Sequence, residues 1–113
     1  MRVKSIAARK HRQVKKLAKG FRQARRTRVK VAKEALAHAG AYAYHGRKLR
    51  KRDMRGLWII RINAALRAEG VSYSQFMSGL KKTKIELNRK ILADIAVSDP
   101  ATFKEILSQV SRA

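Results

Sequence analysis

The chain contains no cysteine, a single proline and only seven acidic residues among 113. Without cysteine, neither a disulfide nor a thiolate-bound metal can stabilise the fold, which is typical of proteins from a reducing compartment. The longest apolar run, Leu57 to Ile60, is far too short to cross a bilayer. No segment alternates with period two, and the few prolines and glycines leave no room for the turns of a β-sandwich. We therefore expect an all-α protein that does not span a membrane.

The amino-terminal half of the chain has almost no negative charge to pair with its positive charge. Fourteen lysines and arginines precede the first acidic residue, Glu34. Residues 1–56 hold 20 basic and two acidic residues, whereas residues 57–113 hold nine and five. Charge of one sign at this density repels itself unless counter-charge surrounds it. The sequence predicts a basic extension, residues 1–56, that binds a polyanion, followed by a small globular domain, residues 57–113.

The basic extension has the composition of helices. Residues 6–19 predict a short helix that ends at Gly20, where a left-handed cap fits. A second helix is predicted over Gln23–Ala39, where a narrow apolar stripe recurs at helical spacing. Residues 41–56 predict a further helical segment, which Gly46 or Gly56 could kink or break because glycine costs about 1 kcal/mol against alanine inside a helix.

The carboxy-terminal domain has the pattern of about four short helices. Trp58, Ile62 and Leu66 form a core-facing row at spacing i, i+4, i+8. Gly70 ends that helix, and a capping pattern at Ser72 predicts the next helix from about Tyr73 to Lys82. Asn88 and the pair Asp99-Pro100 are start signals for two more amphipathic helices. The predicted fold is therefore a long basic helical extension followed by a small helical bundle.

The candidate nucleic-acid contacts in the extension are its basic side chains, together with one histidine and three aromatic residues. Each phosphate that lysine or arginine neutralises releases condensed counterions, and arginine adds a planar fork that fits phosphate oxygens. The aromatic side chains can stack on exposed bases, or instead anchor the extension to its own chain. The alternative for the charge runs is a charged helix face that contacts only solvent. These candidates are Arg2, Lys4, Arg9, Lys10, His11, Arg12, Lys15, Lys16, Lys19, Phe21, Arg22, Arg25, Arg26, Arg28, Lys30, Tyr42, Tyr44, Arg47, Lys48, Arg50, Lys51, Arg52 and Arg55.

Catalysis and metal binding have no recognisable motif in the sequence. His11, His38 and His45 are scattered among cations that would repel a divalent ion. Cysteine is absent, and neither a Gly-x-Ser-x-Gly elbow nor a Walker loop is present. We expect no enzymatic activity, no metal, no cofactor and no small-molecule substrate.

Three polyanion-related alternatives differ in the partner that they imply. A folded RNA suits helices with charge on several sides, because its phosphates approach from several directions. A nucleoid-type DNA-compacting protein would share the charge, but it usually needs a dimer or an arrayed wrapping surface. A membrane-active cationic protein needs a clearer amphipathic face than we expect for the extension. An acid-poor amino end is also found in organelle transit peptides, although here the basic character continues much further.

Seven sequence blocks, spread over the chain, have a specific residue pattern. They are Lys16-Leu17-Ala18-Lys19-Gly20-Phe21, Ala39-Gly40-Ala41-Tyr42-Ala43-Tyr44, Arg50-Lys51-Arg52-Asp53, Leu57-Trp58-Ile59-Ile60-Arg61-Ile62-Asn63-Ala64-Ala65, Gly70-Val71-Ser72-Tyr73-Ser74-Gln75-Phe76, Gly79-Leu80-Lys81-Lys82 and Ile85-Glu86-Leu87-Asn88-Arg89-Lys90-Ile91-Leu92-Ala93-Asp94. Together these blocks resemble the bacterial-type large-subunit ribosomal protein twenty family. The resemblance covers effectively the whole chain, and the tryptophan block is its most specific part.

The resemblance implies a constituent of the large ribosomal subunit that binds ribosomal RNA directly and supports early assembly. The implied partners are large-subunit ribosomal RNA and neighbouring large-subunit proteins, and the chain is expected to be a monomer within a cytoplasmic ribosome, with an organelle ribosome as the alternative. Some members also repress translation of their own message, which implies a possible second role.

The resemblance also extends the RNA contacts to the carboxy-terminal domain. It implies contacts by the Arg50–Arg55 block and by Arg61, Asn63, Tyr73 and Ser74. The spacing adds Arg67, which shares an outward side with Asn63 at i, i+4. One departure from the family pattern concerns Lys84, which stands where the family usually has a helix-ending glycine. This lysine requires either a left-handed backbone or a shifted helix end.

Overall fold

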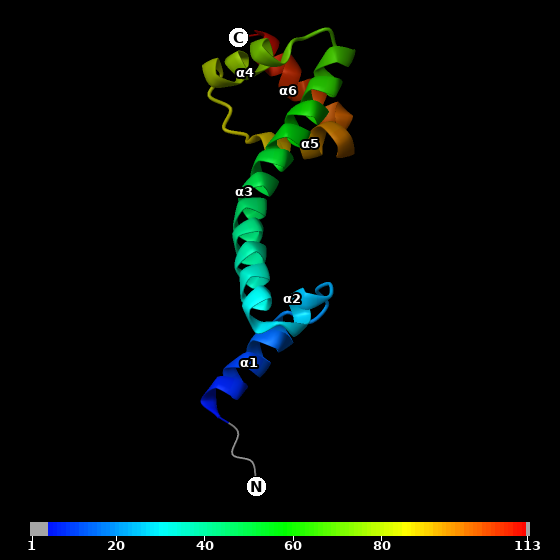
Figure 1. Ribbon diagram of the computed structural model, residues 1–113. Coiled ribbons are helices and arrows are strands. Elements are labelled where there is room, and N and C mark those ends of the chain that lie inside the picture. The colour runs from blue at the N-terminus through cyan, green and yellow to red at the C-terminus, as the bar shows by residue number, and fades with distance from the viewer. Residues whose placement is uncertain (1–4, 113) are drawn as a thin grey trace. The chain divides into compact units, whose positions relative to one another are not determined.

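The computed structural model describes residues 5–112, so the candidate contacts Arg2 and Lys4 lie outside the described residues. The described chain is mostly helical, with no strand between residues 5 and 112 (Figure 1). Its helices are α1 (Ile6–Leu17), α2 (Ala24–Thr27), α3 (Val29–Ala68), α4 (Tyr73–Lys82), α5 (Arg89–Ser98) and α6 (Pro100–Arg112). The predicted all-α class is confirmed. The chain divides into two compact units, with the division after Leu49.

The first unit contains α1, α2 and the beginning of α3. Helix α1 begins after Ser5, whose side chain accepts a hydrogen bond from the amide of Ala8 at 3.2 Å. The helix ends at Leu17, and Gly20 adopts φ +93°, a left-handed conformation that glycine tolerates without a steric cost. The fully buried apolar side chains here are those of Ala18 and Ala32. Such a small core agrees with a segment in which cations occupy most of the surface.

The predicted helix over Gln23–Ala39 is interrupted, which corrects the sequence prediction. Helix α2 is a single turn, Arg28 is extended at φ −91° and ψ 122°, and α3 begins only at Val29. Gln23, before α2, adopts φ +48° although it is not glycine. The local sequence contains neither glycine nor proline at this point, so the break has no local signal. It coincides with the burial of Ala32, a tertiary effect that propensity does not report.

Helix α3 continues without interruption from Val29 to Ala68. Gly40, Gly46 and Gly56 all lie inside it, so the break considered for residues 41–56 does not occur. The boundary predicted between residues 56 and 57 therefore falls within a helix, and as a functional boundary it stays a prediction. Among residues 5–112, no helix combines the length and the apolar character that a membrane span requires.

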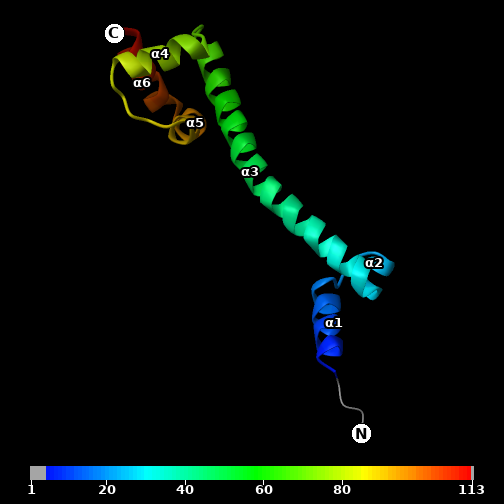
Figure 2. The same ribbon diagram turned by 60° about the vertical axis from the view of Figure 1, so that its left-hand side comes forward.

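The second unit contains the core that the sequence predicted for the bundle. Helices α4 and α5 both pack against α6, beside the carboxy-terminal part of α3 (Figures 1 and 2). Ile62 and Leu66 of α3 are fully buried, whereas Trp58 is half-buried and packs at the edge of the core. The rings of Phe76 and Phe103 lie 5.7 Å apart between centroids. The buried core comprises Ile62, Leu66, Phe76, Leu80, Leu92, Ala93, Phe103, Leu107 and Val110.

Side-chain caps begin the three short helices at the predicted residues. The Ser72 hydroxyl accepts a hydrogen bond from the Gln75 amide at 3.4 Å. The Asn88 Oδ1 accepts one from the Ile91 amide at 2.9 Å. At the start of α6, Asp99 accepts from both the amide and the hydroxyl of Thr102. Each cap satisfies an amide that has no partner within its own helix.

Helices α3 and α4 end in the same hydrogen-bond pattern. After α3, Val71 donates to the carbonyl of Leu66 and Gly70 to that of Arg67. After α4, Ile85 donates to the carbonyl of Leu80 and Lys84 to that of Lys81. Both are Schellman caps, which place the residue after the cap in a left-handed conformation. That residue is Gly70 at φ +73° in the first case and Lys84 at φ +56° in the second.

Candidate nucleic-acid interface

The cations of residues 5–56 lie on the surface of their helices. Every arginine and lysine in this segment is exposed, and so is His11. Those that the sequence analysis assigned to RNA are Arg9, Lys10, Arg12, Lys15, Lys16, Lys19, Arg22, Arg25, Arg26, Arg28, Lys30, Arg47, Lys48, Arg50, Lys51, Arg52 and Arg55. Lys33, which that analysis left out, is equally exposed. Its charge and its position one turn after Lys30 would have been a sufficient signal.

The acidic side chains of the described residues do not pair with these cations. Within residues 5–112 one ion pair forms, between Lys104 and Glu69 at 3.2 Å, and both belong to the carboxy-terminal unit. Glu34 and Asp53, the two acids of residues 1–56, form none in that range. The positive charge of the extension is therefore not compensated within the described fold. A bound polyanion would supply the missing charge.

The two tyrosines of α3 expose their rings. Tyr42 is 71% exposed and Tyr44 is 52% exposed. Tyr42 stacks on His38 with 6.1 Å between ring centroids, and the Lys48 ammonium lies 4.4 Å from the centre of the Tyr44 ring. These contacts are with neighbours on the same helix, one turn away. Neither tyrosine ring is buried against the rest of the chain, and both have exposed surface.

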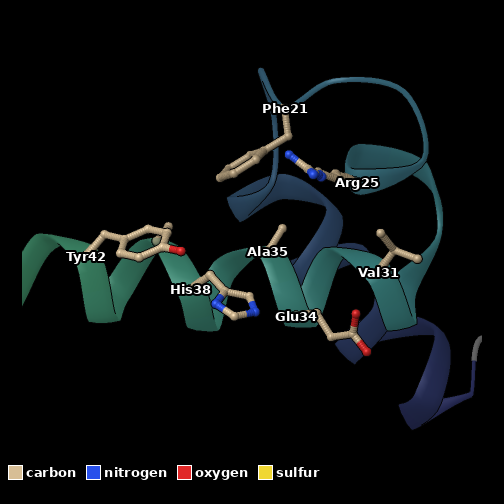
Figure 3. Close-up of a pocket in the computed structure, with 8 residues that line it drawn as sticks. Phe21, Arg25, Val31, Glu34, Ala35, His38 and Tyr42 are labelled. Carbon is tan, nitrogen blue, oxygen red and sulfur yellow. The ribbon is translucent and has the colours of Figure 1, made fainter.

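Phe21 lies in a different setting, a groove beside the first turns of α3. The groove has a volume of about 510 Å³ and is lined by Phe21, Arg25, Val31, Glu34, Ala35, His38, Ala39 and Tyr42. The half-buried Phe21 ring extends over Ala35, with the Arg25 guanidinium next to it, while Glu34 and His38 point away from that ring (Figure 3). The structure thus brings Tyr42 to the same groove as two candidates from an earlier part of the sequence, Phe21 and Arg25.

In the carboxy-terminal unit, the candidates on α3 lie beside the core. Arg61 and Arg67 are exposed, and Asn63 is half-buried. Arg61 and Asn63 flank the buried Ile62, and Arg67 follows the buried Leu66, so packing holds their backbone positions. Arg61 and Arg67 therefore stay candidates for phosphate contacts.

Tyr73 and Ser74 differ in their surroundings. The Tyr73 hydroxyl accepts a hydrogen bond from Nε of Arg89 at 2.9 Å, and its half-buried ring packs against the core. Tyr73 therefore contributes to the fold, whatever else it contacts. Ser74 is exposed at a shallow hollow of about 390 Å³, which Lys82 also lines. A hydroxyl and an ammonium at one hollow suit a phosphate oxygen.

Several further cations of this unit were not predicted to contact RNA. Lys81, Lys82, Lys84 and Lys90 are exposed, and Arg89 is half-buried against Tyr73. Their charge was visible in the sequence, but the contacts that each makes depend on how α4 and α5 fold around the core. Lys82 lines the hollow beside Ser74 and Arg89 bonds Tyr73, which makes these two residues additional candidates.

An all-α fold with uncompensated exposed cations and accessible aromatic rings is characteristic of small nucleic-acid-binding proteins. The family described as Ribosomal protein L20 matches residues 2–106 of this chain. The chain belongs to this family of ribosomal proteins.

Individual relatives match almost the whole chain, and each is named "Large ribosomal subunit protein bL20". The relative from Roseiflexus sp. (strain RS-1) is 53% identical over 108 residues, covering 96% of this chain and 92% of its own. That from Nitrosomonas eutropha is 55% identical, covering 95% and 91%. That from Erythrobacter litoralis is 49% identical, covering 92% and 87%. Family membership makes the chain a structural constituent of the ribosome and not an enzyme, and nothing in these matches supports the DNA-compacting alternative.

Proposed function

We propose that this protein is a constituent of the large ribosomal subunit that binds ribosomal RNA directly and supports early subunit assembly. Residues 5–56 neutralise phosphates with exposed lysines and arginines. The carboxy-terminal unit supplies a folded surface that docks on RNA through Arg61, Arg67 and the hollow at Ser74. The partners are large-subunit ribosomal RNA and neighbouring large-subunit proteins, and the site of action is the ribosome in the cytoplasm or in an organelle.

The observation that carries this proposal is the uncompensated charge of the extension. Its cations are exposed and, within the described residues, form no ion pair with the chain's own acids. A free chain with this charge gains stability when phosphates surround it, because neutralised phosphates release counterions. Early binding to RNA is the expected consequence, since the extension has little apolar core of its own to order it.

The distinction between specific and general binding rests on the carboxy-terminal unit. A polyanion of any shape would satisfy the extension, whereas a folded unit with fixed side chains selects by shape. The resemblance-based role in repressing the chain's own message stays a prediction, since it depends on an RNA outside the protein.

Competition binding tests the proposal. The full chain is bound to a labelled large-subunit ribosomal RNA fragment at near-physiological salt, with duplex DNA and a scrambled RNA of equal length as competitors. We expect both competitors to displace the fragment only at much higher concentration than unlabelled fragment. Equal displacement by every polyanion would contradict site-specific ribosomal binding and would support a general compactor of nucleic acids.

A further inference from the structure

The groove between Phe21 and α3 has the composition of a site for a single unpaired nucleotide. Its aromatic residues come from segments far apart in sequence, Phe21 before α2 and Tyr42 within α3. Alanines 35 and 39 line the groove between them and leave space because their side chains end at Cβ. A volume of about 510 Å³ lies within the range of about 300–1,000 Å³ that small-molecule sites occupy.

Both rings have a surface available for stacking. Tyr42 is 71% exposed, and its aromatic neighbour in the described chain is His38, on the same helix. Phe21 forms no aromatic pair with another described residue. A nucleobase has two flat faces and stacks on any aromatic ring regardless of its sequence identity.

Arginines at the groove favour a nucleotide over an apolar partner, since the one acid of the lining, Glu34, points away from the Phe21 ring (Figure 3). Arg25 lines the groove, and with Arg22 it also lines an adjoining hollow of about 430 Å³. Val31 is shared by the two spaces as well, so they are neighbours along the surface. A base in the groove would place its own backbone phosphate near these guanidinium groups. An apolar side chain of a protein partner would leave them uncompensated.

We propose that the groove holds one unpaired RNA base against Phe21 and Tyr42, with Arg25 on the adjacent phosphate. This inference rests on the proposed RNA-binding function and adds to it a site that requires an unstacked base. A base within a duplex has both faces covered by its neighbours, so only a bulge, loop or end can supply the ligand. The extension would then read RNA shape at one point rather than only neutralise charge.

The test uses the full chain and two hairpin RNAs that differ at one position. In one RNA a 2-aminopurine nucleotide is bulged from the stem, and in the other the same nucleotide is paired. Dissociation constants are measured at one fixed salt concentration, and 2-aminopurine fluorescence reports stacking. We expect tighter binding of the bulged RNA, together with quenching of its fluorescence on binding.

Variants at the groove have matched controls at exposed alanines of α3 that do not line it. Tyr42→Ala removes one stacking ring, Phe21→Leu keeps apolar volume but removes the other ring, and Ala39→Leu fills the groove. Each should reduce the preference for the bulged RNA about five- to a hundredfold and abolish quenching. The controls Ala37→Leu and Ala43→Leu, at exposed residues outside the groove lining, should retain both.

Two results would overturn the inference. Wild-type protein that binds both hairpins equally shows that the groove holds no base, and controls that lose as much as the groove variants show that the effect is not local. The same protein samples are tested for selective binding of the large-subunit ribosomal RNA fragment over scrambled RNA. This measurement separates failure of the groove proposal from failure of the proposed function. If the protein still selects the ribosomal RNA fragment but binds both hairpins equally, only the groove proposal is wrong. If it shows neither selectivity, the proposed function is wrong as well.

Discussion

At the scale of single residues, Lys84 occupies a helix-ending position whose backbone conformation favours glycine. The Schellman cap of α4 requires a left-handed backbone, and Lys84 adopts φ +56° to complete it. A side chain with a Cβ carries a steric cost in this region, whereas glycine carries none. The sequence identified the residue at which the conflict falls, because a helix end with lysine in the glycine position leaves only two outcomes. The structure keeps the cap and places the lysine in the left-handed region.

Replacing Lys84 by glycine should therefore stabilise the protein. The relief of the left-handed cost exceeds the entropy that glycine adds to the unfolded chain, so we expect a gain of about 0.5–1 kcal/mol in the free energy of unfolding. Urea unfolding followed by fluorescence of Trp58, the single tryptophan, measures it. The control is Gly70→Ala at the equivalent position of α3, φ +73°, which should destabilise by about 1 kcal/mol. A Lys84→Gly variant that is less stable than wild type would contradict this interpretation.

Asp99 adds a pH dependence at the residue scale. The hydrogen bonds from the Thr102 hydroxyl and amide lower the pKa of Asp99 from its ordinary value of 3.8. As pH falls, the unfolded state binds the proton first, so stability that is present above about pH 3.8 is lost as pH falls through the lower folded pKa. Asp99→Asn retains a capping oxygen without titrating. Thermal melts from pH 6 to pH 2.5 should show a smaller loss of stability in the variant than in wild type, and identical pH profiles would show that the cap does not titrate.

At the scale of secondary-structure elements, the sequence predicted helices where local signals specify both ends. The helix predicted from Tyr73 to Lys82 has those bounds in the structure, because Ser72 caps its start and the chain turns after Thr83. The break at Arg28 was missed because no glycine, proline or capping side chain marks it. The glycines of α3 suggested a break that does not occur. The groove between Phe21 and Tyr42 was also unpredictable, since it depends on the position of that break.

The contact between α4 and α6 depends on a glycine, which gives a prediction at this scale. A Cβ added to Gly79 would overlap Cγ1 of Val110, a buried residue of the core. Gly79→Ala should therefore destabilise the protein by about 1–3 kcal/mol, although alanine is the better helix former. The double variant Gly79→Ala with Val110→Ala removes the overlapping atoms and should recover part of this loss in a double-mutant cycle of urea unfolding. Strictly additive effects of the two substitutions would show that the side chains do not compete for space.

At the scale of the whole molecule, the two units of the chain differ in their apolar core and in how their charges are compensated. The carboxy-terminal unit buries an apolar core and pairs Lys104 with Glu69, whereas the described part of the first unit buries little more than Ala18 and Ala32. Composition alone predicted this asymmetry, since 20 of the 29 cations precede residue 57. The identity of the RNA-contacting side chains does not follow from composition, because an exposed lysine has the same chemistry whether it meets phosphate or water. That question needs a measurement of how many phosphates each segment neutralises.

The salt dependence of binding supplies that measurement. Replacing Arg50, Lys51 and Arg52 together by alanine should weaken binding to the ribosomal RNA fragment and reduce the slope of log K against log salt by about 0.7–0.9 for each lost phosphate contact. The matched control is Lys81, Lys104 and Arg112 replaced by alanine, which removes the same charge from exposed residues outside the predicted contacts. If only net charge mattered, both triple variants would lose the same slope. A larger change in the first variant places phosphates at Arg50–Arg52, whereas an unchanged slope rejects those contacts even if affinity falls.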